Sequence, residues 1–334
     1  MKALVTGATG LIGSAVVREL KKNGEEVKVL VRRTSNRLNL QGLDLEEAIG
    51  DITDYASIRR ALEGCDRAYH VAALYTMDDR PKDYYRVNVE GTRTVLRACQ
   101  DSGVRRVVYT SSIAAVGSSR DGRPADENTI WDLGELFVPY VTTKYMAEFE
   151  AWRICSQGLP VVVVCPTGPM GARDVKPTPT GRLIVDFLNG KMPLYPPMLF
   201  NVIDVDDVAL GHRLAMEKGR SGERYILSNH NTSLGELLKT VAGLTGVPPP
   251  KMAIPHAVAL VFSFFAELIM TRIIGRPTLF TLAGARMVKR RMHASNAKAV
   301  RELGLTLTPY EEVLRKAVRW FHEHGYIHKP IRVP

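Results

Sequence analysis

A tyrosine and a lysine four residues apart could carry proton transfer in this chain. Tyr140 and Lys144 stand in the stretch YVTTK, and of the twelve tyrosines only Tyr140 has a lysine at this spacing. On a helix, residues four apart lie on one face. A neighbouring ammonium favours the phenolate and lowers the pKa of a tyrosine, so that Tyr140 could act as a general acid or base near neutral pH. A hydroxyl that orients the reacting oxygen is expected from TSS at 110–112, with Ser112 the first choice and Ser111 the second.

Three glycines near the start of the chain could hold a phosphate group. Gly7, Gly10 and Gly13 lie in TGATGLIG, between an apolar run at 2–5 and an amphipathic run at 13–23. In a strand–turn–helix unit, one glycine permits a tight turn, the next lets the backbone approach a pyrophosphate, and the third lets helix and strand pack closely. Free N–H groups at the helix start then bind the phosphates. The pattern G-x-x-G-x-x-G in this context predicts a dinucleotide site, with a bare turn as the alternative.

The residues after the second predicted strand bear on which dinucleotide is bound. Val31 stands near the place where an acid bonds the ribose 2′-hydroxyl in NAD-preferring proteins, and Arg32 and Arg33 follow it. An arginine there can accommodate a 2′-phosphate. We therefore expect NADP, with Arg32 as the contact, while NAD stays open and a solvated surface arginine is the alternative. Asp51, in GDITD after the third strand, is expected at the adenine end of the cofactor.

Alternating strands and helices are needed to position these groups. Helical patterns occur at 13–23, after a capping Asp54, at 83–102 and at 140–157. Continuous apolar strands alternating with helices indicate a parallel sheet covered on both faces, so we expect an α/β fold with a doubly wound Rossmann sheet. The six apolar runs that predict strands lie at 2–5, 27–31, 45–49, 67–73, 105–112 and 159–165.

After residue 165 the regular alternation of strand and helix patterns ends. Proline-rich stretches at 176–183 and 191–200 precede helical patterns at 231–246 and 309–323. We expect residues 1–165 to form a dinucleotide-binding domain. Residues 166–334 should form a smaller, less regular, mainly substrate-binding region, with some segments returning to the first domain. In such sheets ligands bind at the carboxyl ends of the strands, so this region should lie over that edge.

Composition narrows the range of partners. There are 45 lysines and arginines against 35 acids, a net charge of +10, but the basic residues are dispersed and no nucleic-acid-binding motif is found. We expect no nucleic acid partner, and a phosphate-bearing cofactor suits the charge. The cysteines at 65, 99, 155 and 165 lack metal-site spacing, which predicts a reduced, cytoplasmic protein without disulfides or a metal site.

One apolar stretch, 252–270, raises the question of a membrane. Pro255, His256 and Glu267 interrupt it, and its apolar core is short against the roughly 20 residues that a spanning helix needs. We expect a buried helix or one that lines an apolar pocket. The alternative is a peripheral membrane contact, helped by the basic KRR at 289–291.

Taken together, these motifs resemble the extended short-chain dehydrogenase/reductases, over nearly the whole chain. Further similar pieces are HVAA at 70–73, VNVEGT at 87–92 and VDDVA at 205–209. Within the family, TGATGLIG, VRRTSNR, YTSSIAAVG, KPTPTGRLIVD and GERYIL look most like hopanoid-associated sugar epimerases, and dihydroflavonol-reductase-like proteins come next.

The resemblance implies a small-molecule substrate, an NAD(P) cofactor and a catalytic centre of Ser112, Tyr140 and Lys144, with Lys144 also holding the nicotinamide ribose. It further implies a homodimer formed through the helices at 83–102 and 140–157. The residues expected to contact the cofactor are Gly7, Thr9, Gly10, Leu11, Ile12, Gly13, Arg32, Asp51, Ile52, Ala72, Ala73, Tyr140, Lys144, Pro166 and Thr167.

Departures from the family's patterns bear on the reaction. Ile113 and Ala114 follow Ser112 where dehydratases carry an acidic pair, which disfavours dehydration. Gly168 stands near the place of an asparagine, and Asp204 at that of a histidine, in nucleotide-sugar epimerases. Two reactions remain: epimerisation of a sugar or a hopanoid-linked sugar, and net NADPH-dependent reduction of a ketone. A redox-sensing binding protein is a third alternative, which the intact Ser–Tyr–Lys set argues against. Asp207 is expected to be structural.

Overall fold

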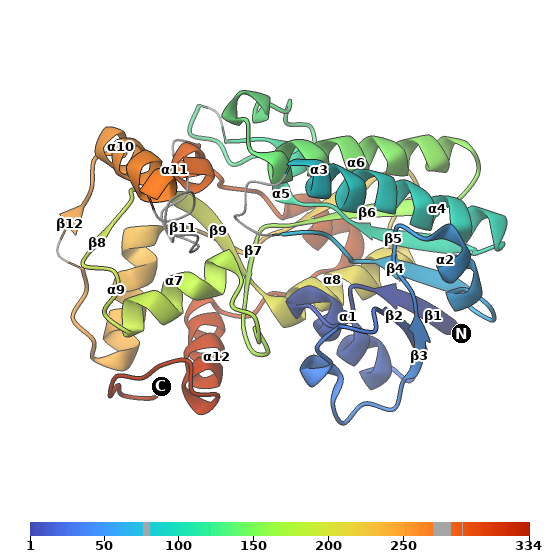
Figure 1. Cartoon of the computed structure of the whole chain (residues 1–334), viewed down its shortest axis with the longest axis horizontal. Helices are drawn as coiled ribbons and strands as arrows, with labels where there is room; N and C mark the ends of the chain where they lie inside the picture. Colours follow the sequence, from blue (N-terminus) through green and yellow to red (C-terminus); the bar gives the residue numbers. More distant parts are fainter. Residues whose placement is uncertain (76–80, 120, 251, 270–281, 289) are drawn as a thin grey trace.

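A computed structural model describes residues 1–75, 81–119, 121–250, 252–269, 282–288 and 290–334. Its centre is a seven-stranded parallel sheet in the order β3-β2-β1-β4-β5-β6-β10 (Figure 1). The strand order reverses between β1 and β4, where such sheets bind ligands. The expected doubly wound Rossmann sheet is confirmed. The strands are β1 (Lys2–Thr6), β2 (Glu26–Val31), β3 (Glu46–Ile49), β4 (Arg67–His70), β5 (Arg106–Thr110), β6 (Val161–Pro166) and β10 (Arg224–Leu227).

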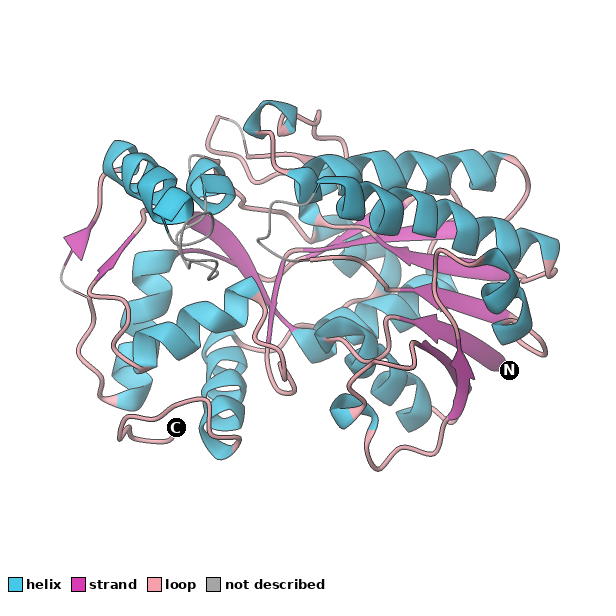
Figure 2. Ribbon diagram, in the orientation of Figure 1, coloured by secondary structure: helices cyan, strands magenta, loops and turns pink. Residues whose placement is uncertain are grey.

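Helices cover both faces of the sheet (Figure 2). On one face α1 (Leu11–Lys22) packs against α8 (Val205–Lys218); on the other lie α2 (Tyr55–Ala61), α4 (Gly91–Asp101) and α6 (Pro139–Ser156). Successive strand side chains point to opposite faces, so Val107 and Val108 of β5 belong to different cores. Because both faces are buried, the strands are continuously apolar, which is the pattern that made them visible in the sequence.

One helix and two strands have bounds that differ from those predicted from the sequence. The helix expected at 83–102 consists of α3 (Pro81–Tyr84), a π-helical stretch at Tyr85–Glu90 and α4. The strand expected at 105–112 stops at Thr110, because Ser112 serves as the N-cap of a short helix, α5 (Ile113–Val116), and accepts a hydrogen bond from the Ala114 amide at 3.2 Å. The strand expected at 67–73 stops at His70, where the chain turns toward β1.

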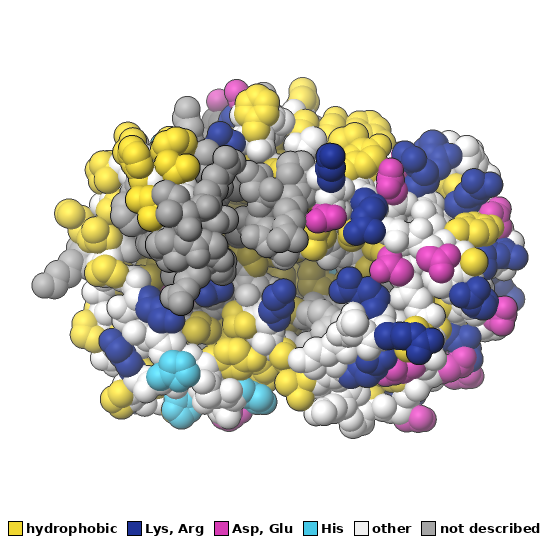
Figure 3. All heavy atoms as spheres, in the orientation of Figure 1, with side chains coloured by type: hydrophobic (Ala, Val, Ile, Leu, Met, Phe, Trp, Pro, Cys, Tyr) yellow, Lys and Arg dark blue, Asp and Glu magenta, His cyan; other side chains and the backbone are white. Residues whose placement is uncertain are grey.

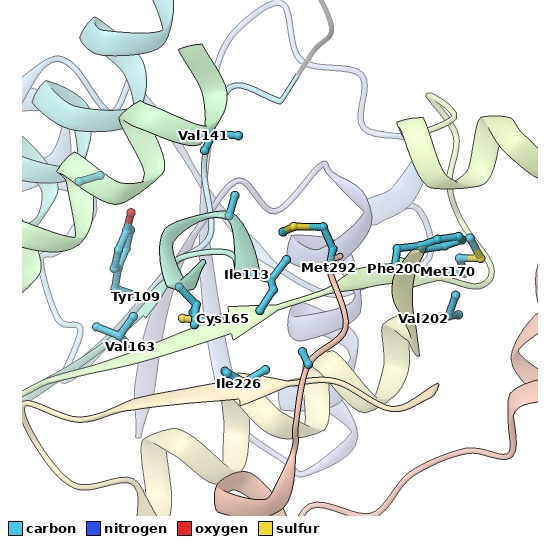
Figure 4. Close-up of a cluster of buried hydrophobic side chains, with 14 of the residues drawn as sticks. Tyr109, Ile113, Val141, Val163, Cys165, Met170, Phe200, Val202, Ile226 and Met292 are labelled. Carbon is cyan, nitrogen blue, oxygen red and sulfur yellow. The ribbon is translucent and has the colours of Figure 1, made fainter. Parts of the chain in front are cut away.

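The C-terminal part packs directly onto this sheet. One continuous core runs from β5 and β6 through β10 to Phe200 and Val202 of β9, as Figure 4 shows. The proline-rich segment 191–200 holds β8 and the start of β9. The helices are α7 (Pro179–Leu188), α9 (Leu234–Thr245), α10 (His256–Glu267), α11 (Leu282–Val288) and α12 (Tyr310–Glu323), with a π-helical turn at Ala299–Leu303; the strands are β7 (Gly168–Met170), β8 (Leu194–Tyr195), β9 (Leu199–Asp204), β11 (His230–Ser233) and β12 (Met252–Ala253).

The apolar stretch 252–270 forms β12 and α10, with residue 270 lying outside the described residues. The expectation that its helix is buried is wrong, because Val261, Phe264 and Phe265 are more than half exposed. Of the helices that the structure describes, none has the length and apolar character needed to cross a membrane.

Candidate active site

The turn between β1 and α1 can be built only with glycine at two positions. Gly7 has a φ of +70°, and a Cβ atom there would lie 2.7 Å from the Cα of Ala72, which follows β4. A Cβ atom on Gly13 would lie 2.1 Å from the carbonyl oxygen of Gly7. The two glycines therefore let α1 start directly against the end of β1.

This turn fits the pyrophosphate of a dinucleotide. Gly10 is the N-cap of α1 and has no side chain to bond the first amides of the helix, so these N–H groups and the positive end of the helix dipole suit an anion. The Thr9 carbonyl is held by the Asn39 amide at 3.2 Å. Leu11 is buried in the core and Ile12 is half-buried beside it.

The end of β2 lies next to this turn. Thr6 is in register with Leu30, so Arg32 follows just beyond the turn at Gly7–Gly13, with its side chain exposed, while Val31 is buried. Asp51 folds back on its own turn and accepts hydrogen bonds from the Thr53 amide and hydroxyl at 2.9 and 2.8 Å. Burial raises the pKa of Asp51, but these hydrogen bonds outweigh it and the pKa is lowered.

Tyr140 and Ser112 come together at the carboxyl edge of the sheet. Tyr140 lies in the first turn of α6, which begins with Pro139 at a position that suits proline. The Ser112 hydroxyl is near its phenol, and the ring of Tyr75 packs against the Tyr140 ring with ring centres 4.6 Å apart. Ser111, the second choice, is engaged elsewhere, since its hydroxyl donates to Glu148 at 2.6 Å.

Lys144 lies one turn after Tyr140 and is almost fully buried. Its ammonium donates to the Thr110 carbonyl oxygen at 2.6 Å and lies 3.5 Å from the Tyr109 hydroxyl. Burial lowers the pKa of Lys144 to about 8. Because an ammonium group is costly to bury, the carbonyl at the end of β5 is its main support.

The expected lowering of the Tyr140 pKa by Lys144 is not found in this structure. Burial raises the pKa of Tyr140 to about 12, and the neighbouring Ser112 hydroxyl opposes this rise. The reason is geometric, because Lys144 is directed at the Thr110 carbonyl rather than at the phenol. In this arrangement Tyr140 is a neutral phenol that holds its proton at neutral pH.

Glu148 is a buried acid at the site that the sequence analysis missed. It accepts from Ser111 and forms an ion pair with Arg224 of β10 at 3.1 Å, and burial raises its pKa. It lies four residues after Lys144, so the spacing was visible. Nothing in the spacing distinguishes a buried glutamate from one on a helix surface.

Two further polar side chains, Asn88 and His70, hold neighbouring segments of the candidate site in place. Asn88, in the π-helical stretch, accepts from the Leu74 amide at 2.7 Å and so holds the loop that carries Tyr75. His70 is buried between Thr6 and Thr92, at 2.8 and 3.0 Å, and burial lowers its pKa to about 3, which leaves the ring neutral.

The loop after β6 closes the other side. Pro166 ends β6, and the Thr167 hydroxyl donates to the Asn201 side chain at 2.7 Å. A Cβ atom on Gly168 would lie 2.6 Å from the Asn201 carbonyl oxygen, which excludes a larger side chain. Asp204 is buried, caps α8 and pairs with Lys316 at 2.7 Å.

The remaining sequence-predicted residues line the same edge or support it. Ala72 and Ala73 follow β4 beside Gly7, and Ile52 packs against the helix start at Gly91. Asp207 binds both the amide and the hydroxyl of Thr308, at 2.7 and 2.9 Å, and so ties α8 to the C-terminal part.

Comparisons with known proteins agree with this geometry. The model of the NAD-dependent epimerase/dehydratase family matches residues 3–228. The chain is 40% identical to a putative dihydroflavonol 4-reductase of Synechocystis sp., over 97% of this chain and 95% of that protein. It is 36% identical to sterol demethylase protein B of Methylococcus capsulatus, over 98% and 100%. The solved structure of a nucleoside-diphosphate-sugar epimerase from Pseudomonas aeruginosa, 29% identical, matches with a TM-score of 0.83 over 98% of this chain and 99% of that one.

Proposed function

The chain belongs to the NAD-dependent epimerase/dehydratase family, and from this premise we propose that it is an NADPH-dependent reductase that converts a ketone into a secondary alcohol. Membership makes it an NAD(P)-dependent epimerase or reductase. The observation that carries the choice of reduction is Gly168, where a Cβ atom would lie 2.6 Å from the Asn201 carbonyl oxygen. The asparagine with which nucleotide-sugar epimerases hold the diphosphate of their substrate therefore has no room there. Tyr140 would be the acid that delivers a proton to the carbonyl oxygen.

The cofactor would lie across the carboxyl ends of the strands. The backbone of Gly7–Gly13 would hold its pyrophosphate, and Arg32, the exposed cation after β2, would bind a 2′-phosphate, which favours NADP over NAD. Asp51 and Ile52 would flank the adenine end, Ala72 and Ala73 the middle of the cofactor, and Pro166 and Thr167 the nicotinamide. When bound, this cofactor supplies the hydride.

The protein's own residues would handle the proton. Ser112 would hydrogen bond the substrate oxygen, and Tyr140 would give that oxygen its proton. Lys144 would hold the nicotinamide ribose and, as a cation, would stabilise the phenolate that Tyr140 becomes. Since Lys144 donates to Thr110 in this structure, it would keep that carbonyl as an anchor while its other N–H groups turn to the ribose.

Other members' reactions fit these residues less well. Ile113 and Ala114 are buried aliphatic side chains, so the two positions after Ser112, where dehydratases carry an acidic pair, hold no acid to support dehydration. An asparagine at 168, which would hold a nucleotide-sugar diphosphate, would collide with the Asn201 carbonyl. Asp204 is used inside the protein to cap α8 and bind Lys316, so it is not presented to a substrate.

The test follows from what each reaction does with the cofactor. A reductase must exchange its dinucleotide at every turnover, whereas an epimerase returns the hydride and keeps it. We expect the purified protein to oxidise NADPH in a one-to-one ratio with a ketone drawn from a panel of bicyclic and steroidal ketones. No consumption with any ketone, together with a dinucleotide that stays bound after purification, would reject this proposal.

Epimerisation of a sugar, or of a sugar joined to a hopanoid lipid, is the second candidate. It is supported by the motif similarity to hopanoid-associated sugar epimerases and by the name of the Pseudomonas structure. Inversion of a sugar carbon without added NADPH would establish it.

We also infer that the chain forms a homodimer through α4 and α6. Met146 and Phe149 are large apolar side chains exposed on α6, beside the Arg93–Glu150 ion pair that links the two helices. Light scattering coupled to gel filtration should give twice the mass of one chain, and Phe149→Glu should return the monomer.

A further inference from the structure

Helix α10 carries its large side chains on the side that faces away from the protein. Ala259 and Ser263 are 5% and 3% exposed, whereas Val261 is 59% and Phe265 53% exposed. On an ordinary surface helix the bulky apolar residues face the core. Figure 3 shows hydrophobic side chains gathered over α10. Such an arrangement requires an apolar partner outside the chain.

These exposed side chains form one continuous stripe. They recur at helical spacing along α10 and past its end, and together make what we call the apolar face of α10. The stripe is extended by Met252 of β12, which is 60% exposed and pairs with Leu194 of β8, which is 41% exposed. The apolar face consists of Val258, Val261, Phe264, Phe265, Leu268 and Ile269.

The apolar face is rigidly joined to the rim of the candidate active site. His256 at the start of α10 donates to the Ala285 carbonyl of α11 at 3.1 Å. On its other side, α11 packs against the turn at 134–136 that leads into α6 and Tyr140, and Arg286 donates to the Leu136 carbonyl at 3.4 Å. The apolar face is therefore linked through α11 to the segment that precedes Tyr140 in the chain.

The charge of this part of the chain indicates which partner fits. Residues 251–291 include seven lysines and arginines against one acid, Glu267, so this segment of the sequence has a net charge of +6 out of the chain's +10. Lys251, Arg272, Arg276 and Lys289 lie outside the described residues, and Arg290 is paired with Asp132 and Glu135. Of these basic residues, Arg291 is exposed in the structure. Two copies of so basic a segment would repel each other, which disfavours a second copy of the chain as the partner. A surface that is anionic on the outside and apolar inside would bind both the apolar side chains of α10 and the basic charge of this segment.

We propose that the protein docks on an anionic phospholipid bilayer through the apolar face of α10. The helix has 12 residues and is therefore ~18 Å long, too short to span a hydrocarbon core of about 30 Å. It lies flat in the interface, with Phe264 and Phe265 among the acyl chains and Arg291 at the headgroups. This proposal does not depend on whether the reaction is reduction or epimerisation.

Sedimentation of the full chain with vesicles tests the docking. We expect binding to vesicles of phosphatidylcholine with 30% phosphatidylglycerol, weak binding to pure phosphatidylcholine, and loss of binding as NaCl is raised. Val261→Asp should lower the partition coefficient between vesicles and water about tenfold or more. In the docked state Val261 lies among the lipids, and the variant would place a carboxylate there, beside an anionic surface. Val333→Asp, the same change at an exposed valine near the C-terminus, should bind as the wild type does.

A second variant separates docking from misfolding. Arg291→Glu leaves the apolar face intact and should weaken binding to the anionic vesicles, with an unchanged thermal midpoint. The proposal is overturned if the wild type does not bind, if binding is equal on the two vesicle types, or if Val261→Asp binds as tightly as the wild type. Self-association that Val261→Asp abolishes, without vesicle binding, would assign the apolar face to a second copy of the chain instead.

Discussion

The ammonium nitrogen of Lys144 lies 2.6 Å from the carbonyl oxygen of Thr110, the last residue of β5. Two residues further on, the Ser112 hydroxyl is near the Tyr140 phenol. The end of one strand therefore carries the group that holds Lys144, the Thr110 carbonyl, and the hydroxyl that neighbours Tyr140. The pair is linked through β5 and not by direct contact between phenol and ammonium.

Burial of Lys144 makes stability depend on pH. Its pKa in the folded protein is about 8, below the ordinary 10.5, so between these values the unfolded chain binds more protons than the folded one. Stability then rises with pH over this window. We expect the unfolding free energy of the wild type, relative to Lys144→Met, to increase by about 2 kcal/mol between pH 8 and pH 10. Urea titrations at the two pH values measure it, and a difference that falls with pH would contradict the assignment.

Loss of the Tyr140 hydroxyl should remove turnover and leave the cofactor site intact. Tyr140→Phe should lower kcat by roughly 10²–10⁴-fold with the Kd for NADPH within a few-fold of the wild type. Ser112→Ala should act in the same direction. Ser111→Ala is the matched control, since its hydroxyl serves Glu148, and it should affect stability more than kcat. Equal kcat losses in the two serine variants would contradict the assignment of Ser112.

The phosphate-binding turn allows a comparison between two glycines. Gly13→Ala would place a methyl group 2.1 Å from the Gly7 carbonyl oxygen, so the turn must open. NADPH affinity should fall at least tenfold, about 1.4 kcal/mol. In Gly10→Ala the nearest protein atom is at an ordinary 3.4 Å, so the fold should be kept, but the methyl group stands where the backbone must approach the pyrophosphate and NADPH affinity should still fall. Isothermal titration calorimetry measures both affinities, and a Gly10→Ala variant that binds NADPH as tightly as the wild type would place the dinucleotide elsewhere.

Arg32 should set the preference between the two dinucleotides. Arg32→Ser should weaken NADP binding by about 10- to 100-fold through loss of a charge-assisted hydrogen bond, and should leave NAD binding nearly unchanged. Arg33→Ser, its neighbour, is the control. If both cofactors weaken equally, Arg32 does not contact the 2′-phosphate.

The buried carboxylate of Glu148 should contribute to the free energy of unfolding. Glu148→Gln keeps the shape but removes the charge that faces Arg224, and should cost about 1–3 kcal/mol of unfolding free energy. Glu150→Gln on the same helix removes a more exposed carboxylate and should cost less than about 1 kcal/mol. Chemical denaturation of the two variants should rank them in this order.

The parts of the site that the sequence revealed are those fixed by local geometry. Gly7 and Gly13 were visible because only glycine satisfies that turn, and Tyr140 with Lys144 because a helix brings such a spacing onto one face. The partners of Lys144 and Glu148 were not visible, since Thr110 and Arg224 come from strands 34 and 76 residues away in the chain. Likewise, the composition of α10 predicted burial, but which of its sides is covered depends on α11, a separate helix.

The central claim, that this enzyme reduces a ketone with NADPH, is tested most directly by following the hydride. The protein is incubated with NADPH carrying two deuterium atoms at C4 of the nicotinamide and with separate pools of hopanoid intermediates, nucleotide sugars and small ketones, and products are analysed by mass spectrometry. We predict an alcohol that contains one deuterium for each NADPH oxidised, and no such product from Tyr140→Phe. A sugar epimer formed without NADPH consumption and without deuterium would contradict the account.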